Sequence, residues 1–402
     1  MNQEQENALF SIQDGKNTLI TGGAGVGKSF TVDHVVDWAH ESHKHIGVCA
    51  MTGCAALLIN GQTLHSFLGI GLAKEPAATL AKKVSKFTVV RERIQCLDIL
   101  LIDEVSMLSA ELFEKVEEFL RLVRKSKKLF GGVQIILVGD PFQLCPIDGT
   151  YFFDCTLWKE NTFVRHTLNC NMRQSTDIPF KELHDRLRMG VCPPADFELL
   201  QKLQETKFES DITPTRLYSK NVSVDAINQA ELAKLATPRT SFNLVCSNES
   251  SERWAKTNRI PENIQLCVGA QVMCTKNLSE LGLVNGSRGV ITSISPSNVT
   301  MKLVDGRIIV VAPIIVKQLE NTFLEVKYLP LKLAWAITIH SSQGMTIDAL
   351  EVDLGRDIFT CGQAYTGLSR ARNSASVRVV SVMAKSFTTN SKVLNFFQDN
   401  CI

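Results

Sequence analysis

The segment at residues 22–29 reads G-x-x-x-x-G-K-S, and it constrains the fold of this chain more than any other stretch. A short apolar run at 18–21 precedes it and predicts a buried strand. The segment after it places Val32, Val35, Val36 and Ala39 at helical spacing. Glycines let successive backbone N–H groups turn toward an anion, and the N-terminus of a helix attracts negative charge. Strand, loop and helix together therefore predict a phosphate-binding loop and disfavour a glycine-rich turn that matches by chance.

The residue types in this loop predict how it would hold a nucleoside triphosphate. The ammonium group of Lys28 can reach the β- and γ-phosphates, and the hydroxyl of Ser29 can bind Mg²⁺. The backbone N–H groups of the glycine-rich part would surround the phosphates. The predicted nucleotide-binding residues of the loop are Gly22, Gly23, Ala24, Gly25, Val26, Gly27, Lys28 and Ser29.

A second apolar run, at 97–102, ends in the adjacent carboxylates Asp103 and Glu104. The first carboxylate at such a strand end can hold Mg²⁺ together with Ser29, and the second can activate the attacking water. Two acids can also mark a surface loop, but the phosphate-binding loop upstream favours the catalytic interpretation. Strands near 18–21, 46–50, 97–102 and 133–138 alternate with helical segments, which predicts an α/β fold with a doubly wound parallel sheet.

The length and composition of the chain set broad limits. Its 402 residues suggest two or three domains, and a hydrophobic content of 45% with 21% charged residues is ordinary for a globular protein. The net charge of +2 does not indicate nucleic-acid binding, so a basic groove would have to arise from local clustering. Twelve cysteines without a C-x-x-C pair argue against a zinc ribbon or a redox motif. No signal peptide or membrane-length apolar run is evident, so we expect a soluble intracellular protein with reduced thiols.

The segment at 72–95 has a strongly basic character. Six Lys and Arg residues, among them Lys82 and Lys83, face only two glutamates, and Phe87 lies between them. Basic residues interleaved with an aromatic suit a phosphate backbone with a base stacked nearby. A solvated helix face is the alternative, and the cluster alone does not decide between the two. Nearby, His65 beside Phe67 favours packing over ligand contact when it is considered alone.

The last third of the chain predicts a β-rich insertion in a second α/β domain. Alternating segments at 290–294, 299–304, 307–311 and 323–328 predict strands of a small β-barrel at about 287–331. Apolar residues resume at 333 and lead to a Ser-Arg-Ala-Arg turn that contains Arg370. An arginine on a second domain is what a triphosphatase needs to stabilise charge in the transition state.

From about residue 3 to residue 372, the ordered set of segments resembles the Pif1-like branch of superfamily 1 helicases, which is related to RecD and the phage T4 Dda helicase. The stretch 112–146 is similar to the signature that distinguishes Pif1 proteins, and it is the most specific marker. The other matching segments are 2–5 for the Q motif, 22–29 for motif I, 52–56 for motif Ia, 63–71 for the next DNA-facing motif, 103–104 for motif II, 139–143 for motif III, 173–174 for motif IV, 338–346 for motif V and 363–372 for motif VI.

This resemblance implies two RecA-like P-loop domains with parallel sheets, a small inserted wedge element and an SH3-like β-barrel. The first domain, 1A, would span 1–165 and include the small 1B insertion at about 72–95. The second domain, 2A, would combine 166–286 and 332–402. The inserted 2B domain, the SH3-like barrel, would occupy 287–331.

The resemblance also implies an ATP-dependent 5′-to-3′ DNA helicase that uses Mg²⁺, acts as a monomer on single-stranded and forked DNA, and serves replication, repair, recombination or telomere maintenance. G-quadruplexes and RNA–DNA hybrids remain open as substrates. Three alternatives also remain open: a DNA-dependent ATPase or translocase without strand separation, a RecD-like recombination subunit, and a nucleotide-gated binding module without catalysis.

Functional residues follow from the resemblance position by position. The implied catalytic residues are Lys28, Asp103, Glu104, Gln143, Arg173 and Arg370, and Ser29 and Asp103 would hold the metal. Gln5 and Gly344 would add nucleotide contacts. The implied DNA contacts are Thr52, Gly53, His65, Ser66, Phe67, Lys82, Lys83, Thr338, His340 and Ser342. Two positions depart from the family pattern: Cys145 replaces a proline, and Ser341 replaces a lysine, which removes one phosphate contact.

Overall fold

The computed structural model describes all residues of the chain except 147–149, 159–161, 171–176, 209–213, 258–259, 277, 284–286, 304–305, 319–320, 348 and 399–402. The chain divides into unit 1, Met1–Ile212 with Ser342–Ile402, and unit 2, Thr213–Ser341. This division does not follow the expected domain boundaries, which stay a prediction.

Unit 1 is built on a parallel sheet whose strands at 18–22, 99–103 and 134–139 are mainly apolar and buried on both faces, as is typical of parallel sheets. In the described part of the chain its strand order is β3-β2-β4-β5-β1-β6. Every neighbouring pair runs parallel, with Leu19 of β1 opposite Leu137 of β5. The strands are β1 (Thr18–Gly22), β2 (Ile46–Ala50), β3 (Gln62–Thr63), β4 (Ile99–Asp103), β5 (Gln134–Gly139) and β6 (Val164–Leu168). The predicted α/β fold with a parallel sheet is confirmed.

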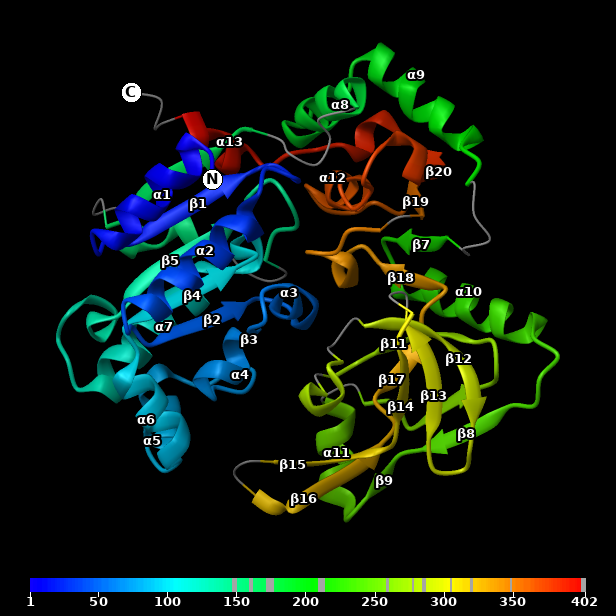
Figure 1. The fold of residues 1–402 in the computed structure, drawn as a ribbon, viewed down its shortest axis with the longest axis horizontal. Helices are drawn as coiled ribbons and strands as arrows, with labels where there is room; N and C mark the ends of the chain where they lie inside the picture. The colour runs from blue at the N-terminus through cyan, green and yellow to red at the C-terminus, as the bar shows by residue number, and fades with distance from the viewer. Residues whose placement is uncertain are drawn as a thin grey trace. The chain divides into compact units, whose positions relative to one another are not determined.

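Helices connect these strands and cover the sheet (Figure 1). The helix predicted after the phosphate-binding loop is α2, and it buries Val32, Val35 and Ala39. An N-terminal helix, α1, packs on β6 and α2. The helices of this part are α1 (Gln3–Gln13), α2 (Lys28–Glu41), α3 (Gly53–Leu58), α4 (Leu64–Leu68), α5 (Ala77–Val84), α6 (Thr88–Cys96) and α7 (Ala110–Arg124). Two further helices, α8 (Ile178–Arg188) and α9 (Pro194–Lys202), follow the last strand of this sheet and contact the segments 363–368 and 377–382.

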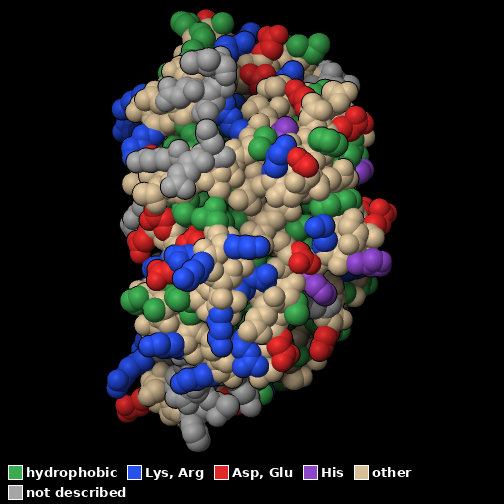
Figure 2. Space-filling model, turned by 90° about the vertical axis from the view of Figure 1, so that its left-hand side faces the viewer, with side chains coloured by type: hydrophobic (Ala, Val, Ile, Leu, Met, Phe, Trp, Pro, Cys, Tyr) green, Lys and Arg blue, Asp and Glu red, His purple; other side chains and the backbone are tan. Residues whose placement is uncertain are grey.

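The basic segment at 72–95 forms α5 and α6, which pack on α7. Arg124 of α7 fixes the end of α6, because its guanidinium donates hydrogen bonds to the carbonyls of Ile94, Gln95 and Leu97. Figure 2 shows Lys and Arg side chains gathered on the lower half of the face on which these helices lie. The exposed lysines of α5, of the α5–α6 turn and of the segment after α7 are Lys82, Lys86, Lys125, Lys127 and Lys128.

The C-terminal segment completes unit 1. Its parallel strands pair Leu350 with Val377, and its last helix, α13, packs against residues 142–165. The ring of Phe396 stacks on Phe153 with centroids 4.2 Å apart, and Phe397 lies 5.0 Å from Phe142. The elements are β19 (Leu350–Leu354), α12 (Gln363–Leu368), β20 (Val377–Val382) and α13 (Ser391–Gln398).

Unit 2 combines a parallel strand pair with antiparallel sheets. Strand β7 (Thr215–Tyr218) pairs with β18 (Ala336–Thr338), and helix α10 (Asn221–Lys234) packs on both. The described residues also form a five-stranded antiparallel sheet in the order β14-β13-β12-β11-β17. These strands are β11 (Gln271–Cys274), β12 (Arg288–Ile294), β13 (Val299–Leu303), β14 (Ile308–Val311) and β17 (Leu331–Leu333). The predicted strands at 290–294, 299–304 and 307–311 are confirmed as β12, β13 and β14, and the sheet also takes in β11, ahead of 287.

Shorter antiparallel sheets and one helix complete unit 2. Strand β16 lies between β15 and β9, and β10 pairs with β8. The elements are β8 (Thr240–Asn243), β9 (Val245–Cys246), α11 (Glu249–Thr257), β10 (Asn263–Leu266), β15 (Ile314–Gln318) and β16 (Asn321–Tyr328). Among the helices that the structure describes, none has both the length and the apolar character needed to cross a membrane.

Candidate active site

The phosphate-binding loop joins the end of β1 to the start of α2, as predicted. Gly27, the residue before α2, has a positive φ of 85°, and a Cβ at this position would lie 2.6 Å from Nε2 of Gln5. A side chain at 27 would therefore clash as well as strain the backbone. The amide of Gln5 is itself held in place, because its Oε1 accepts the N–H of Asn2 in a capping box at the start of α1. The structure thus places Gln5 against the loop.

Lys28 lies among carboxylates. Its ammonium group donates to the carbonyls of Gly22 and Gly23, at 2.8 and 2.7 Å. Burial lowers the pKa of Lys28, while the charges of Asp140, Glu104 and Asp103 oppose that shift. These carboxylates therefore favour the charged ammonium form, which is the form that attracts phosphate.

Of the two predicted acids, Asp103 is the last residue of β4 and Glu104 follows it. Oδ1 of Asp103 accepts the N–H of Glu104 at 2.8 Å, and Glu104 has a positive φ of 54°, a strained conformation for a residue with a long side chain. Burial, together with the neighbouring charge of Glu104, raises the pKa of Asp103 to about 7. A cation beside this carboxylate would relieve both effects.

These residues fit a magnesium ion shared with a substrate. Mg²⁺ in proteins commonly takes one or two carboxylates and completes its shell with phosphate oxygens and water. Asp103 supplies a buried carboxylate, and Ser29, which is exposed in the first turn of α2, supplies a hydroxyl. Clusters of three or more His, Cys, Asp or Glu side chains suited to a metal are absent from the described residues. The donor set therefore suits an ion that arrives with phosphate.

Asp103→Asn is expected to stabilise the ligand-free protein at pH 8 and to leave its stability unchanged at pH 4. An acid whose pKa is higher in the folded state binds an extra proton there, so stability is lost as pH rises from about 4 to about 7. Asparagine does not titrate, so the variant does not lose this stability as pH rises. The shift in the pKa of Asp103 corresponds to a difference of at most about 4 kcal/mol in the free energy of unfolding. Urea unfolding of both proteins at pH 4 and pH 8 measures the difference. The exposed Asp37→Asn on α2 is the control, and an equal effect of Asp103→Asn at both pH values would contradict the expectation.

Residues from the C-terminal segment of unit 1 reach the same site. Nε2 of Gln343 donates to Oε2 of Glu104 and to Oγ of Ser106, each at 3.0 Å. Gly344, with φ of 82°, lies so close that a Cβ there would be 3.4 Å from Oε1 of Glu104. Gly344, a predicted nucleotide contact, therefore lies beside the Glu104 carboxylate, and its role stays a prediction.

Arg370 and Gln143, two of the predicted catalytic residues, lie side by side. Arg370 is buried, and one terminal nitrogen donates to Oε1 of Gln143 at 3.3 Å. Its other donors are held by the carbonyls of Thr366 and Met345 and by the hydroxyl of Ser369. Burial lowers the pKa of Arg370, although the charge of Glu104 opposes this shift. Arg173 lies outside the described residues.

A cavity of about 390 Å³ opens beside the loop. It lies between Gly23 and Ala24 on one side and Leu168 and Asn169 on another, and Lys181 and Arg188 of α8 also line it. Arg188 forms a bidentate ion pair with the fully buried Asp140, with nitrogen–oxygen distances of 2.8–3.1 Å. A cavity of this size beside a phosphate-binding loop suits a nucleotide.

Sequence reasoning missed four polar residues of this site. Asp140 and Tyr365 lie inside segments 139–143 and 363–372, and Gln343 lies inside 338–346, so the motif matches contained a signal for these three. Arg188 lies outside every matched segment, and only its contact with Asp140 reveals it.

The predicted DNA contacts in the first part of unit 1 lie on α3, α4 and α5 and at Thr52, directly before α3. Thr52 accepts the N–H of Ala55 and Gly53 begins α3, while Ser66 is exposed on α4. Lys82 is exposed, and Lys83 pairs with Glu75 at 2.9 Å. Burial lowers the pKa of His65. These assignments stay predictions.

Phe67 differs from the predicted contacts Ser66 and Lys82, which are exposed, because only 7% of the residue is exposed. Its ring packs under the guanidinium of Arg93, 4.6 Å from the ring centre, and Arg93 also donates to its carbonyl. This burial gives no support to the prediction that the ring contacts a base.

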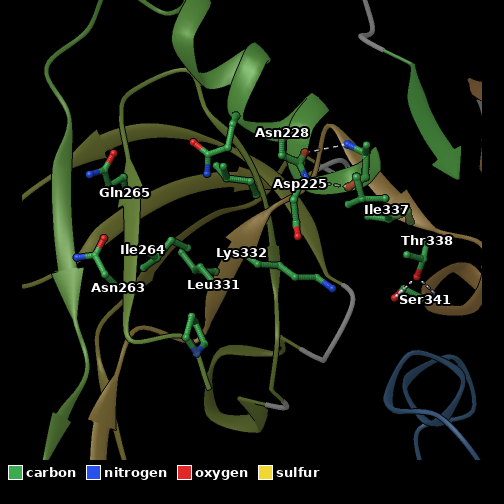
Figure 3. Close-up of a pocket in the computed structure, with 15 residues that line it drawn as sticks. Asp225, Asn228, Asn263, Ile264, Gln265, Leu331, Lys332, Ile337, Thr338 and Ser341 are labelled. Carbon is green, nitrogen blue, oxygen red and sulfur yellow. Dashed lines mark hydrogen bonds between the residues drawn. The ribbon is translucent and has the colours of Figure 1, made fainter. Parts of the chain in front are cut away.

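In unit 2, Thr338 borders a pocket of about 300 Å³ (Figure 3). Its hydroxyl shares a 2.9 Å hydrogen bond with that of Ser341, and Lys332 extends across the pocket. Asn263 and Gln265 lie at the opposite end. His340 begins a short 3₁₀ turn after β18, and burial lowers the pKa of His340. The turn ends at Ser342, the first residue of the C-terminal segment of unit 1, which is fully buried, and this burial gives no support to a DNA contact. Ser341 thus has a local partner where the resemblance implies a lysine.

The parallel sheet, the loop and the paired carboxylates place this chain in the class of P-loop nucleoside triphosphatase folds. The model of the PIF1-like helicase family matches residues 1–188, and that of the DNA helicase Pif1 2B domain matches 255–294. The chain belongs to the PIF1-like helicase family.

Known relatives agree with this assignment. The chain is 35% identical to the ATP-dependent DNA helicase PIF1 of Danio rerio over 99% of its own length, but it spans only 64% of that relative. It is 31% identical to the ATP-dependent DNA helicase Pif1 of Bdellovibrio bacteriovorus, with 99% and 92% of the two chains covered. Its structure matches that of the Candida albicans Pif1 helicase with a TM-score of 0.89, 31% identity and coverage of 99% and 98%.

A further structural match carries ligands. The Pif1 helicase from Bacteroides in complex with ADP-AlF3 and single-stranded DNA matches with a TM-score of 0.81 and 27% identity, over 99% of this chain and 96% of that one.

Proposed function

We propose that this chain is an ATP-dependent DNA helicase that moves 5′ to 3′ on single-stranded DNA and unwinds duplex or structured DNA. The observation that carries the proposal is the convergence of Lys28, Asp103, Glu104, Gln143 and Arg370 at one buried site. A binding module without catalysis would not need this set of charges beside a phosphate-binding loop. The names of the Danio rerio and Bdellovibrio relatives support the same activity.

The proposed chemistry assigns each residue a task. Lys28 attracts the β- and γ-phosphates. Ser29 and Asp103 would hold Mg²⁺, which would supply charge neutralisation at the phosphates. Glu104 accepts a proton from the attacking water, and Gln343 holds this carboxylate in position. Arg370 stabilises the charge that develops on the γ-phosphate, as does Arg173 in this proposal. Gln143 couples the γ-phosphate to the DNA site. Gln5 favours adenine over other bases.

The DNA side of the proposal rests on the basic helices and on the small residues at strand ends. Lys82 and Lys83 would contact the phosphate backbone, with 72–95 as the wedge at a fork. Thr52, Gly53, His65, Ser66, Thr338, His340 and Ser342 would line the path of the strand. We further propose that the chain is organised as domains 1A, 1B, 2A and 2B with the boundaries expected from the sequence, and that it acts as a monomer.

Strand displacement tests this function most directly. With ATP and Mg²⁺, a duplex that carries a 5′ single-stranded tail is expected to open, and one that carries only a 3′ tail is expected to stay closed. Lys28→Ala is the control that should abolish both opening and ATP hydrolysis. Opening of the 3′-tailed substrate alone would overturn the polarity.

The same assay separates the alternatives. ATP hydrolysis stimulated by single strands without any opening of forked duplex would favour a translocase or a RecD-like subunit. The absence of hydrolysis with retained nucleotide binding would favour a binding module. Displacement from RNA–DNA hybrids and unfolding of G-quadruplexes would define the range of substrates.

A further inference from the structure

The hydroxyl of Tyr365 touches the phosphate-binding loop. Tyr365 lies on α12 and is only 3% exposed. Its hydroxyl accepts the backbone N–H of Ala24 at 3.3 Å and donates to Oδ2 of Asp140 at 3.1 Å. The hydroxyl has one proton, which it donates in the hydrogen bond to the Asp140 carboxylate. The hydrogen bond from the N–H of Ala24 is therefore accepted by a lone pair of the hydroxyl oxygen.

The Asp140 side of this bridge is firmly held. Asp140 is fully buried, and besides Tyr365 it accepts hydrogen bonds from Arg188 and from the N–H of Phe142. The guanidinium of Arg188 also lies over the ring of Phe142, 4.1 Å from its centre. Burial and the charge of Asp140 raise the pKa of Tyr365 far above its usual value, so the hydroxyl keeps its proton. The bond to Ala24 is therefore the weaker end of the bridge.

The Ala24 side belongs to the segment whose N–H groups bind phosphate. A phosphate oxygen is charged, and a charged acceptor makes a shorter and stronger hydrogen bond with an N–H group than a neutral phenol oxygen does. Gly23 lies next to the bridge, because a Cβ there would be 3.7 Å from the Tyr365 hydroxyl and 3.7 Å from Cδ of Arg188. A phosphate bound at Gly23 and Ala24 would therefore lie beside Tyr365 and Arg188.

We propose that Tyr365 is a positioning residue whose hydroxyl competes with a phosphate of the bound nucleotide for the N–H of Ala24. When a phosphate takes the N–H of Ala24, the Tyr365 hydroxyl keeps only its hydrogen bond to Asp140, which also binds Arg188. Phosphate binding at the loop thereby changes the contacts of α12, which contains Tyr365, and of α8, which contains Arg188. This inference rests on the proposed function, because it requires ATP to bind at the loop.

Tyr365→Phe is expected to tighten the binding of AMPPNP, a non-hydrolysable ATP analogue, by about two- to tenfold, the effect of one net hydrogen bond. The affinity for adenosine, which has no phosphate, should not change. Displacement of a fluorescent nucleotide measures both constants. Tyr151→Phe is the matched control, because Tyr151 is also buried and its ring stacks on Phe153, outside this site.

Amide hydrogen exchange provides a readout that does not depend on nucleotide. Tyr365→Phe should speed exchange in a peptide that covers 22–27, with no change in peptides from β5, and thermal unfolding should show that the variant is folded. Unchanged AMPPNP affinity in a folded variant, or an equal change for adenosine, would overturn this inference alone. Failure of the unaltered protein to bind AMPPNP would overturn the proposed function and the inference with it.

Discussion

Replacing Arg370 with alanine is expected to lower DNA-stimulated ATP hydrolysis by ~10³-fold or more, because an arginine that stabilises transition-state charge contributes on that scale. The side chain is buried, and it contacts Gln143 from a helix end that the chain reaches only after residue 362. Nucleotide binding should persist, since Lys28 and the loop remain. Steady-state hydrolysis with saturating single-stranded DNA, combined with a nucleotide-binding titration, measures both effects.

The variant needs a test of folding, because Arg370 also binds Thr366, Met345 and Ser369. Arg370→Lys keeps the charge but cannot form this set of bonds, so it should also be slow. The exposed Arg356→Ala serves as the control. Normal turnover in folded Arg370→Ala would remove Arg370 from the catalytic set.

Glu104→Gln is expected to slow hydrolysis by about 10²- to 10⁴-fold, the range for loss of a general base. The substitution keeps the size and shape of the side chain, so Gln343 can still donate to the remaining carbonyl oxygen. The affinity for ATP should stay equal or rise, because one negative charge near the phosphates is lost. Single-turnover hydrolysis isolates this chemical step from product release.

Glu111→Gln on α7 is the matched control, since the Glu111 side chain is 81% exposed. A Glu104→Gln protein that hydrolyses ATP at the normal rate would show that another group activates the water. Weaker nucleotide binding with unchanged chemistry would instead assign Glu104 a role in holding the metal.

Local sequence signals predicted the central part of unit 1. The apolar run at 18–21 and the glycines after it correspond to β1 and the loop, and the run that ends at Asp103 is β4. These predictions succeeded because strand, turn and helix preferences act over a few residues. The strands at 290–294 and 299–304 were found for the same reason.

The remaining features depend on contacts between distant residues. Ala24 and Tyr365 are 341 positions apart, and no local pattern relates them. Arg188 was missed because an arginine in the last turn of a helix is most often solvated. Its ion pair with the buried Asp140 is visible only in the structure. The sequence from 264 to 330 predicted β structure, but that β11 joins the antiparallel sheet depends on its pairing with β12 and with the distant β17.

The packing of α13 has a consequence for where the chain can be cut. Phe396 and Phe397 complete a core whose other members, Phe142, Phe152, Phe153 and Trp158, come more than 230 residues earlier. Arg165 reinforces this contact, because its guanidinium faces both phenylalanine rings and donates to the carbonyl of Phe396. A fragment that stops before residue 391 would lack Phe396 and Phe397. The four earlier aromatic rings would then be exposed to water, and the fragment would tend to aggregate. The nucleotide-binding half is therefore a discontinuous folding unit, and expression of it should include residues 342–398.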